Sequence, residues 1–154
     1  MRLLFLLMLV TLGALNTLSA QGLNRWSLGL HGGADVSDDH TLKLLGAHLG
    51  YGIATGTRIQ LAVTSVIEEP GTTVFGGLTA QWSPTRWTLR PFVGGGLGMG
   101  YSEAGPFSDT ELGGMVQGGF RFFLRNLTPF AELRLFSFDG TRTQILIGFE
   151  SRAY

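Results

Sequence analysis

Two histidines and three serines are the side chains best suited to nucleophilic catalysis in this 154-residue chain. They are His31, His48, Ser27, Ser65 and Ser102. Acyl transfer by such residues needs a nucleophile, a base and an orienting acid held together. The sequence contains neither a Gly-x-Ser-x-Gly nor a His-x-Ser motif. His31, with Asp35 close by, is the best candidate for a base, but the pattern predicts histidines without chemistry and therefore no enzyme.

Three aspartates, Asp35, Asp38 and Asp39, are the acids best placed to bind a divalent cation. Their spacing does not match a calcium-binding EF-hand loop, which needs acids at alternate positions and a glutamate at its end. We therefore expect a solvated acidic loop and no metal site. The chain has no cysteine, which excludes disulfides and thiolate ligands. No phosphate-binding loop, nucleotide fingerprint or basic nucleic-acid patch is present, so we expect no cofactor and no nucleic acid.

A group of charged residues shares one face of the strands predicted below. Its members are Arg90, Arg121, Glu132, Arg134 and Glu150. A four-residue turn at Arg125–Thr128 would place Arg121 opposite Glu132 as a cross-strand ion pair. In a narrow interior, loss of one partner would leave the other charge unpaired at a cost of about 3–5 kcal/mol. The group is either a polar plug that fixes strand register, which we favour, or a gate in a small pore.

Alternating apolar and polar side chains predict that β-strands position these residues. The alternation is unbroken from Trp87 to Tyr101, where Gly and polar residues face away from the apolar side. The predicted strands are 25–34, 42–53, 57–67, 73–82, 87–102, 111–124, 129–138 and 142–150. Joined by short connections, they predict an all-β fold: a single closed antiparallel up-and-down transmembrane barrel of about eight strands. Parity within the hairpins predicts the pairs Trp82–Trp87, Phe120–Leu133 and Leu135–Ile145.

Period two does not by itself say which face lies inside. A soluble ligand-binding barrel would turn the apolar face inward, whereas a membrane barrel turns it toward lipid. Glycines such as Gly96 and Gly98 crowd the polar face, where a small barrel needs room. Trp26, Trp82 and Trp87 lie at one rim of the apolar face, as interfacial aromatics do. With only 14% charged residues, the chain is predicted to cross a membrane; the soluble barrel is the alternative.

Residues 1–20 are predicted to be a secretory signal peptide, followed by a barrel domain over 21–154. Arg2 provides the positive start, Leu3–Leu15 the apolar stretch, and Leu18-Ser19-Ala20 a small-residue cleavage site. The alternative is an uncleaved membrane anchor, but the apolar stretch is short for a span. The remaining 134 residues suit one domain.

Two segments resemble the small outer-membrane β-barrel family of Gram-negative bacteria, the eight-stranded kind. They are the glycine-rich strand from Pro91 to Tyr101 and the sequence from Gly118 to Arg134, in which an aromatic-x-Glu-x-Arg strand follows a turn. The resemblance covers residues 87–138 and implies location in the cell outer membrane. It also implies contact with outer-membrane lipid and lipopolysaccharide, insertion by the barrel-assembly machinery, and a monomer. Its motifs specify architecture, so we expect a structural or cell-surface interaction role; a lipid-modifying enzyme and a small pore are the alternatives.

The C-terminus departs from the family pattern. Such barrels usually end on an aromatic that continues the apolar face and is read by the assembly machinery. Ile145, Ile147 and Phe149 alternate as expected, but Tyr154 falls out of phase. Either a bulge lies within 150–153, or the recognition signal ends at Phe149.

Overall fold

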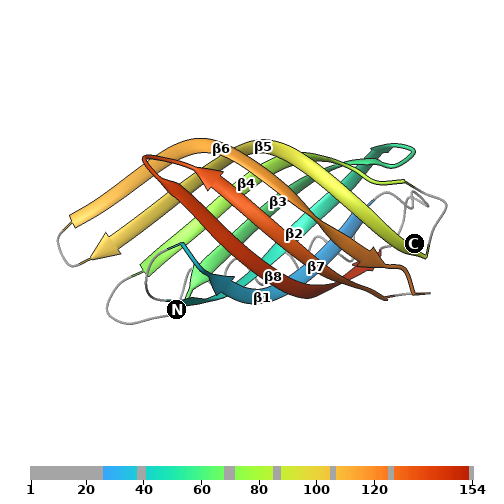
Figure 1. Ribbon diagram of the computed structural model, residues 1–154, viewed down its shortest axis with the longest axis horizontal. Coiled ribbons are helices and arrows are strands. Elements are labelled where there is room, and N and C mark those ends of the chain that lie inside the picture. Colours follow the sequence, from blue (N-terminus) through green and yellow to red (C-terminus); the bar gives the residue numbers. More distant parts are fainter. Residues whose placement is uncertain are drawn as a thin grey trace.

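Eight antiparallel strands form a closed barrel in the computed structural model of the chain (Figure 1). The structure describes residues 26–37, 41–67, 72–84, 88–104, 107–124 and 127–152. The strands are β1 (Trp26–Asp35), β2 (Leu42–Ala54), β3 (Thr57–Val66), β4 (Thr72–Trp82), β5 (Leu89–Ala104), β6 (Phe107–Phe122), β7 (Leu127–Ser137) and β8 (Thr141–Arg152). Each strand pairs with its sequence neighbour, and β8 pairs with β1 to close the ring. The predicted all-β, up-and-down barrel is confirmed.

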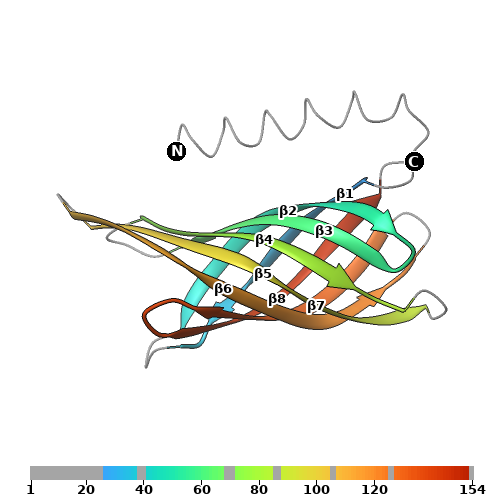
Figure 2. The ribbon, with the colours of Figure 1, turned by 90° about the horizontal axis from the view of Figure 1, so that it is seen from above.

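The two ends of the barrel carry different connections. β1 begins and β8 ends at one end, which we call the terminal end. At the opposite end, the loop end, β1 connects to β2, β3 to β4, β5 to β6 and β7 to β8 (Figure 2). The shortest strands, β1 and β3, have 10 residues each. A tilted strand of about 9–11 residues crosses a bilayer, so every strand is long enough to do so.

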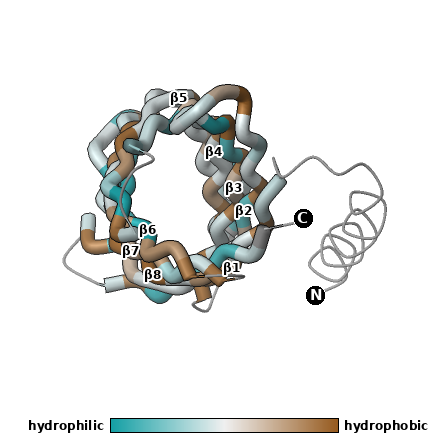
Figure 3. Tube along the Cα trace, turned by 90° about the vertical axis from the view of Figure 1, so that its right-hand side faces the viewer, coloured by the Kyte–Doolittle hydropathy of each residue, from teal (hydrophilic) through white to brown (hydrophobic). Residues whose placement is uncertain are grey.

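The outer wall of the barrel is apolar and its interior is largely polar. Leu97 and Leu112 are 71% and 77% exposed on the outside, whereas Gln60 and Gln144 are fully buried. The strict alternation of exposed and buried residues along β7 shows the same division. The end-on view in Figure 3 shows the closed ring that separates the two faces. A soluble barrel with its apolar face inside does not agree with this arrangement.

The predicted faces are correct, but the predicted register of three hairpins is wrong. The observed pairs are Trp82–Val93, Phe120–Ala131 and Leu135–Thr143, in place of Trp82–Trp87, Phe120–Leu133 and Leu135–Ile145. Every shift is an even number of residues, so each side chain stays on its predicted face. The cause lies in the connections, because β5 begins only at Leu89 and β7 begins already at Leu127.

The hairpin formed by β5 and β6 projects beyond its neighbours at the loop end (Figures 1 and 2). Both strands have 16 residues, and their pairing continues to Ala104 and Phe107. β7, in contrast, pairs with β6 only up to Gly114. The segment 107–113 of β6 therefore rises past the end of β7. The sequence predicted a connection at 103–110 here, because Ser, Asp, Thr and Glu are common in turns.

Some predictions fall on parts of the chain that the structure does not describe. They concern the signal peptide at 1–20, Trp87, Asp38, Asp39 and Tyr154. β8 keeps its register with β7 through Ser151 and with β1 through Arg152, so the strand has no bulge within 150–152. Within the residues that the structure describes, no helix has the length and apolar character needed to cross a membrane.

Candidate functional site in the barrel interior

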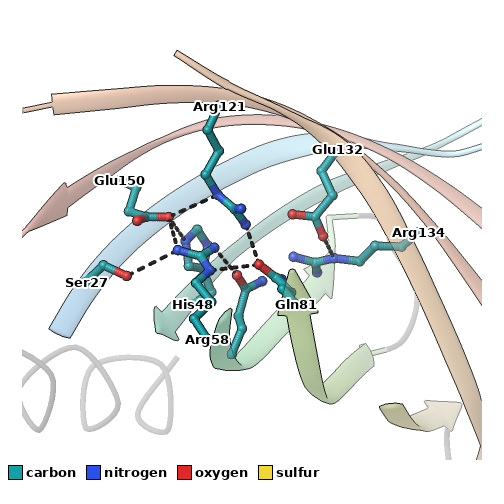
Figure 4. Close-up of polar contacts among 9 residues, drawn as sticks. Ser27, His48, Arg58, Gln81, Arg121, Glu132, Arg134 and Glu150 are labelled. Atoms are coloured by element: carbon teal, nitrogen blue, oxygen red, sulfur yellow. Dashed lines mark hydrogen bonds and ion pairs between the residues drawn. The ribbon is translucent and has the colours of Figure 1, made fainter. Parts of the chain in front are cut away.

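Glu150 lies at the centre of a buried polar cluster near the terminal end (Figure 4). Its Oε2 atom lies 2.6 Å from Arg58 Nη1 and 3.6 Å from Arg121 Nε. His48 Nε2 lies 3.4 Å from the same oxygen. Side chains from β2, β3 and β6 therefore meet at one carboxylate of β8, which joins opposite walls of the barrel.

Gln81 connects the two arginines of this cluster. Its Oε1 atom accepts hydrogen bonds from Arg58 Nε at 2.7 Å and from Arg121 Nη2 at 2.5 Å. Arg58 also donates to Gln60 and, at 3.4 Å, to Ser27 Oγ. Shared acceptors thus hold two guanidinium groups close to each other. We call Arg58, Gln81, Arg121 and Glu150 the Glu150 cluster.

The predicted ion pair between Arg121 and Glu132 is wrong. In the observed register, Arg121 lies opposite Phe130, and Glu132 lies opposite Gly119. Glu132 instead accepts a hydrogen bond from Arg134, two residues further along β7. A register shift of two residues is enough to separate the predicted partners.

Arg134 belongs to this second pair in the middle of the interior. Besides Glu132, it contacts Thr64 through its Nη1 atom at 3.2 Å. Arg134 and Glu132 are 1% and 3% exposed, so the pair is deeply buried. One carboxylate balances one guanidinium here, as buried charges require.

Arg90 stands apart from both groups. Its guanidinium carbon lies 4.1 Å from the centre of the Phe123 ring. Arg90 is directly opposite Arg121 across β5 and β6, and the Arg121 guanidinium stacks over Phe92 at 3.6 Å. The five predicted network residues therefore divide into two buried clusters and one arginine at the terminal mouth.

His31 and His48 lie inside the barrel, where one contacts a threonine and the other a glutamate. His31 Nε2 lies 2.8 Å from Thr64 Oγ1, and His48 faces Glu150. The two rings stack with their centres 5.8 Å apart. Both histidines are less than 4% exposed, so substrate outside the wall cannot reach them. Within the described part of the chain, no group of three His, Asp or Glu is placed to hold a metal ion.

Asp35 is the described member of the predicted acidic loop. It is 2% exposed, and its Oδ1 atom accepts hydrogen bonds from the backbone and hydroxyl of Ser37. Ser37 Oγ in turn accepts a hydrogen bond from the backbone nitrogen of Thr143. Asp35 therefore fixes the connection after β1 to the start of β8, instead of lying in solvent as predicted.

An apolar layer fills the interior toward the loop end. Phe75, Met115 and Phe136 form its buried core, and Val66 and Phe138 pack against them. The Phe75 and Phe136 ring centres are 5.7 Å apart. We call these five residues the aromatic layer. It closes the interior above the polar clusters.

Two glycines make room for the aromatic layer. A β-carbon on Gly98 would lie 2.6 Å from Cδ1 of Phe136, and one on Gly77 would lie 2.6 Å from Cε of Met115. Real β-carbons do not approach other atoms this closely, so a larger residue would force the layer to move. The glycine-rich face of β5 therefore provides space for large residues on facing strands.

The predicted interfacial tryptophans are found at the terminal end where the structure describes them. Trp82 is 56% exposed at the end of β4. Trp26 begins β1 and packs against Tyr51, with ring centres 4.6 Å apart. This is the place and face expected for aromatic residues at a membrane surface.

A cavity of about 250 Å³ opens at the terminal end. Its wall includes Trp26, Arg58, Arg90, Arg121, Phe123 and Glu150. The cavity thus lies directly below the Glu150 cluster and above the mouth of the barrel.

Sequence reasoning placed Arg58 and Gln81 on the polar face but did not select them as site residues. Their parity with Gln60 and Thr79 was the available signal, but parity cannot show that Arg58 reaches Glu150 or that Gln81 joins Arg58 to Arg121. The aromatic layer was also missed. Its signal was that Phe75, Met115 and Phe136 are out of phase with the apolar face of their strands.

Solved structures of outer-membrane barrels share this fold. Neisserial surface protein A is 15% identical, with a TM-score of 0.64, and the match covers 84% of this chain and 96% of that one. The N-terminal barrel domain of Pseudomonas aeruginosa OprF is 17% identical, with a TM-score of 0.62 and coverage of 86% and 99%. The attachment invasion locus protein Ail of Yersinia pestis is 12% identical, with a TM-score of 0.59 and coverage of 83% and 95%.

No protein-family model matches the sequence, and no curated protein sequence matches it. The outer membrane enzyme PagL also shares the fold, with a TM-score of 0.54 at 10% identity. A structure from the de novo design of transmembrane barrels does so too, with a TM-score of 0.61. The chain therefore has the fold of the eight-stranded outer-membrane β-barrels. That fold occurs in natural surface proteins, in an enzyme and in a design, so it does not determine activity.

Proposed function

We propose that this barrel, which has the fold of the outer-membrane proteins, is an integral protein of the cell outer membrane. In this proposal it has a structural or cell-surface interaction role and no chemistry of its own. The observation that carries the proposal is the division of faces. A continuous apolar wall faces outward, and the interior is closed by buried side chains from both polar and apolar residues. Such a wall is stable only in lipid.

The proposal also covers orientation and partners. An exported chain reaches the outer membrane from the periplasm, so we place the terminal end there and the loop end at the cell surface. Outer-membrane lipid then contacts the wall, and lipopolysaccharide surrounds the loop end. We propose insertion by the barrel-assembly machinery and a monomeric state, because eight strands already close the sheet and leave no open side edge.

Gel mobility of the washed outer-membrane fraction, boiled and unboiled, tests the location. We expect a fast unboiled band that slows after boiling, because a closed barrel resists detergent until heated. A protein that leaves the membrane on carbonate extraction and shows no shift would contradict the proposal.

The filled interior argues against a pore. Arg134, Gln60 and Gln144 are at most 1% exposed in the middle of the barrel, and Phe136 closes the layer above them. We therefore expect no steady conductance in planar lipid bilayers. Discrete channel openings by the wild-type protein would support the pore alternative instead.

The position of the histidines argues against a lipid-modifying enzyme. Both lie behind the wall, and the hydroxyl in contact with His31 belongs to the buried Thr64. PagL shows that the fold accommodates an enzyme, so the question needs an assay. We expect unchanged acylation of lipid A on overexpression, and no difference between wild type and His31→Ala.

The projecting β5–β6 hairpin is the element that we assign to surface contacts. Glu103, Asp109 and Glu111 lie on it, and all three are at least partly exposed. Carboxylates bind divalent cations, which also bind phosphate groups. We expect Asp109→Asn with Glu111→Gln to weaken the Mg²⁺-dependent binding of lipopolysaccharide while leaving the heat-dependent gel shift unchanged. Equal binding of lipopolysaccharide by this variant and the wild type would contradict the assignment of surface contacts to the β5–β6 hairpin.

A further inference from the structure

We propose that an open apolar pocket in the outer wall of the barrel binds one acyl chain of a phospholipid. The inference rests on the proposed function, because only a barrel in a membrane turns this wall toward lipid. The pocket has a volume of about 360 Å³ and crosses the seam between β1 and β8. Residues of β2, β1, β8 and β7, which are neighbours in the closed sheet, surround it. They include Leu45, Leu30, Gly32, Ile147, Phe149 and Pro129. We call it the seam pocket.

Gly32 leaves a gap in the apolar wall, and this gap forms the seam pocket. Leu30 is 61% exposed on the outside and His31 is buried, so the alternation along β1 turns position 32 outward again. Gly32 has no side chain to place there. Its cross-strand neighbours Leu45 and Ile147 are 53% and 66% exposed on the same face. The wall is therefore hollowed at Gly32, between two projecting apolar side chains.

The lining of the seam pocket selects a hydrocarbon ligand. Of the described residues that line it, His31 alone has a polar side chain, and that side chain points into the barrel, where its Nε2 atom contacts Thr64. The outer surface of the pocket therefore offers leucine, isoleucine, proline and phenylalanine side chains and no charge for a headgroup. Pockets for small ligands have volumes of about 300–1,000 Å³, and this one lies within that range. An acyl chain gains more van der Waals contacts in such a hollow than against a convex wall.

The depth of the seam pocket identifies the source of the chain. Trp26 and Tyr51 form an aromatic pair at the terminal end, and Leu30 lies four residues further along β1. At about 3.3 Å per residue and a strand tilt of about 40°, Leu30 lies about 10 Å from that rim. This depth is within the hydrocarbon of a bilayer about 30 Å thick, so a headgroup does not reach the pocket. Pro129, the third residue of β7, extends the pocket toward the terminal end. The chain therefore enters from the leaflet at that end, which we place at the periplasm, and belongs to a phospholipid and not to lipopolysaccharide at the loop end.

Nuclear magnetic resonance of backbone amides tests the seam pocket in the folded chain, held in dodecyl maltoside micelles. Dipalmitoyl phosphatidylethanolamine is the probe, and lipopolysaccharide is titrated separately as the lipid of the other leaflet. Glycerophosphoethanolamine, which has the same headgroup and no acyl chains, is the control ligand. We expect saturable shifts of the Gly32 and Gly148 amides with the phospholipid, because both residues line the pocket. Gly95, an exposed glycine on β5, should show no saturable shift.

Gly32→Leu fills the seam pocket, and Gly95→Leu is the matched control on the opposite side of the ring. A β-carbon at either position would lie 3.5 Å from a neighbouring backbone oxygen, which is ordinary contact, so both variants should fold. We expect Gly32→Leu to weaken phospholipid binding, read at the Gly148 amide, by about tenfold or more. One methylene alone can change binding in an apolar pocket by about that factor. Gly95→Leu should leave the binding unchanged.

Several results would overturn the proposal. They are the absence of saturation with the phospholipid, equal shifts with glycerophosphoethanolamine, saturation by lipopolysaccharide alone, and equal binding by Gly32→Leu and the wild type. A dimer in light scattering that Gly32→Leu dissociates would assign the pocket to a second copy of the chain and overturn it too.

The heat-dependent gel shift separates this proposal from the proposed function. If the wild type shows the gel shift but no saturation, the seam pocket alone is contradicted, whereas a wild type without the shift contradicts the membrane location itself. If Gly32→Leu fails to fold, as judged by gel mobility, the wild-type titration still decides, because a nonspecific effect of lipid would move the Gly95 amide as much as the Gly32 amide.

Discussion

The interior of the barrel is filled in two different ways. Toward the terminal end, the Glu150 cluster joins four strands through charge and hydrogen bonds. Toward the loop end, the aromatic layer joins four strands mainly through apolar packing against glycines on the facing strands, and the Arg142 guanidinium lies 5.6 Å from the centre of the Phe75 ring. A charged cluster requires one arrangement of its partners, and removing one partner leaves a buried charge unpaired. In an apolar layer, the loss of stability instead grows with the volume of side chain removed. The comparison indicates that the polar half fixes the register and the apolar half closes the lumen.

The largest effect is expected from Glu150→Ala. This change leaves the Arg58 and Arg121 guanidiniums without their shared carboxylate, and we expect the free energy of unfolding to fall by about 3–5 kcal/mol. Urea unfolding in lipid vesicles measures it. The exposed Glu103→Ala serves as the control and should stay within about 0.5 kcal/mol of wild type. A loss of unfolding free energy for Glu150→Ala as small as that of the control would show that the Glu150 cluster does not fix the arrangement of the strands.

Phe136→Ala is expected to have the next largest effect. Removal of this ring from the aromatic layer costs about 3 kcal/mol, at the lower end of the usual range for Phe→Ala, because water can enter from the loop end. The same unfolding experiment measures the loss. Phe136→Leu keeps most of the volume and should recover more than half of it. Equal losses for the two substitutions would mean that the layer is not close-packed.

Gly98→Val tests the fit between β5 and the aromatic layer. The new side chain would collide with Phe136, and we expect a loss of about 1–3 kcal/mol. Adding Phe136→Leu should restore part of that stability, although Phe136→Leu alone is destabilising. Simple addition of the two losses would contradict the proposed contact.

The smallest effect expected is a coupling energy. In a double-mutant cycle, Arg121→Ala and Glu150→Ala should differ from additivity by about 1 kcal/mol or more, because the side chains contact each other. Arg121→Ala and Glu132→Ala should be additive within about 0.5 kcal/mol, because the observed register places Arg121 opposite Phe130 and Glu132 opposite Gly119. Coupling between Arg121 and Glu132, together with additivity between Arg121 and Glu150, would instead support the register predicted from a four-residue turn at 125–128.

The sequence was sufficient to predict the strands and their faces, because side-chain parity along a strand does not depend on its partners. It was not sufficient for register. An even shift in the register between β6 and β7 keeps every side chain on its face, yet it separates Arg121 from Glu132. Arg121 contacts Glu150 instead. The length of the turn determines the register, and the alternation of side chains along a strand gives no information about turn length. Predicting the aromatic layer would have required knowing which glycines lie across the lumen. Predicting the role of Arg58 would have required knowing which strands meet at Glu150.

The position of Glu150 on the last strand also has a kinetic consequence. The seam between β1 and β8 joins the two ends of the chain, so the barrel is complete only after its final strand has paired. Until then, Arg58 and Arg121 lack their shared carboxylate, and an unfinished sheet contains two repelling cations without their counterion. Closure of the barrel and neutralisation of these charges therefore occur together, which makes folding cooperative. We also expect folding to be slow, because the contacts that close the barrel join residues far apart in the sequence. A chain that stops before Glu150 would lose both the seam and the counterion, and no stable seven-stranded intermediate is expected.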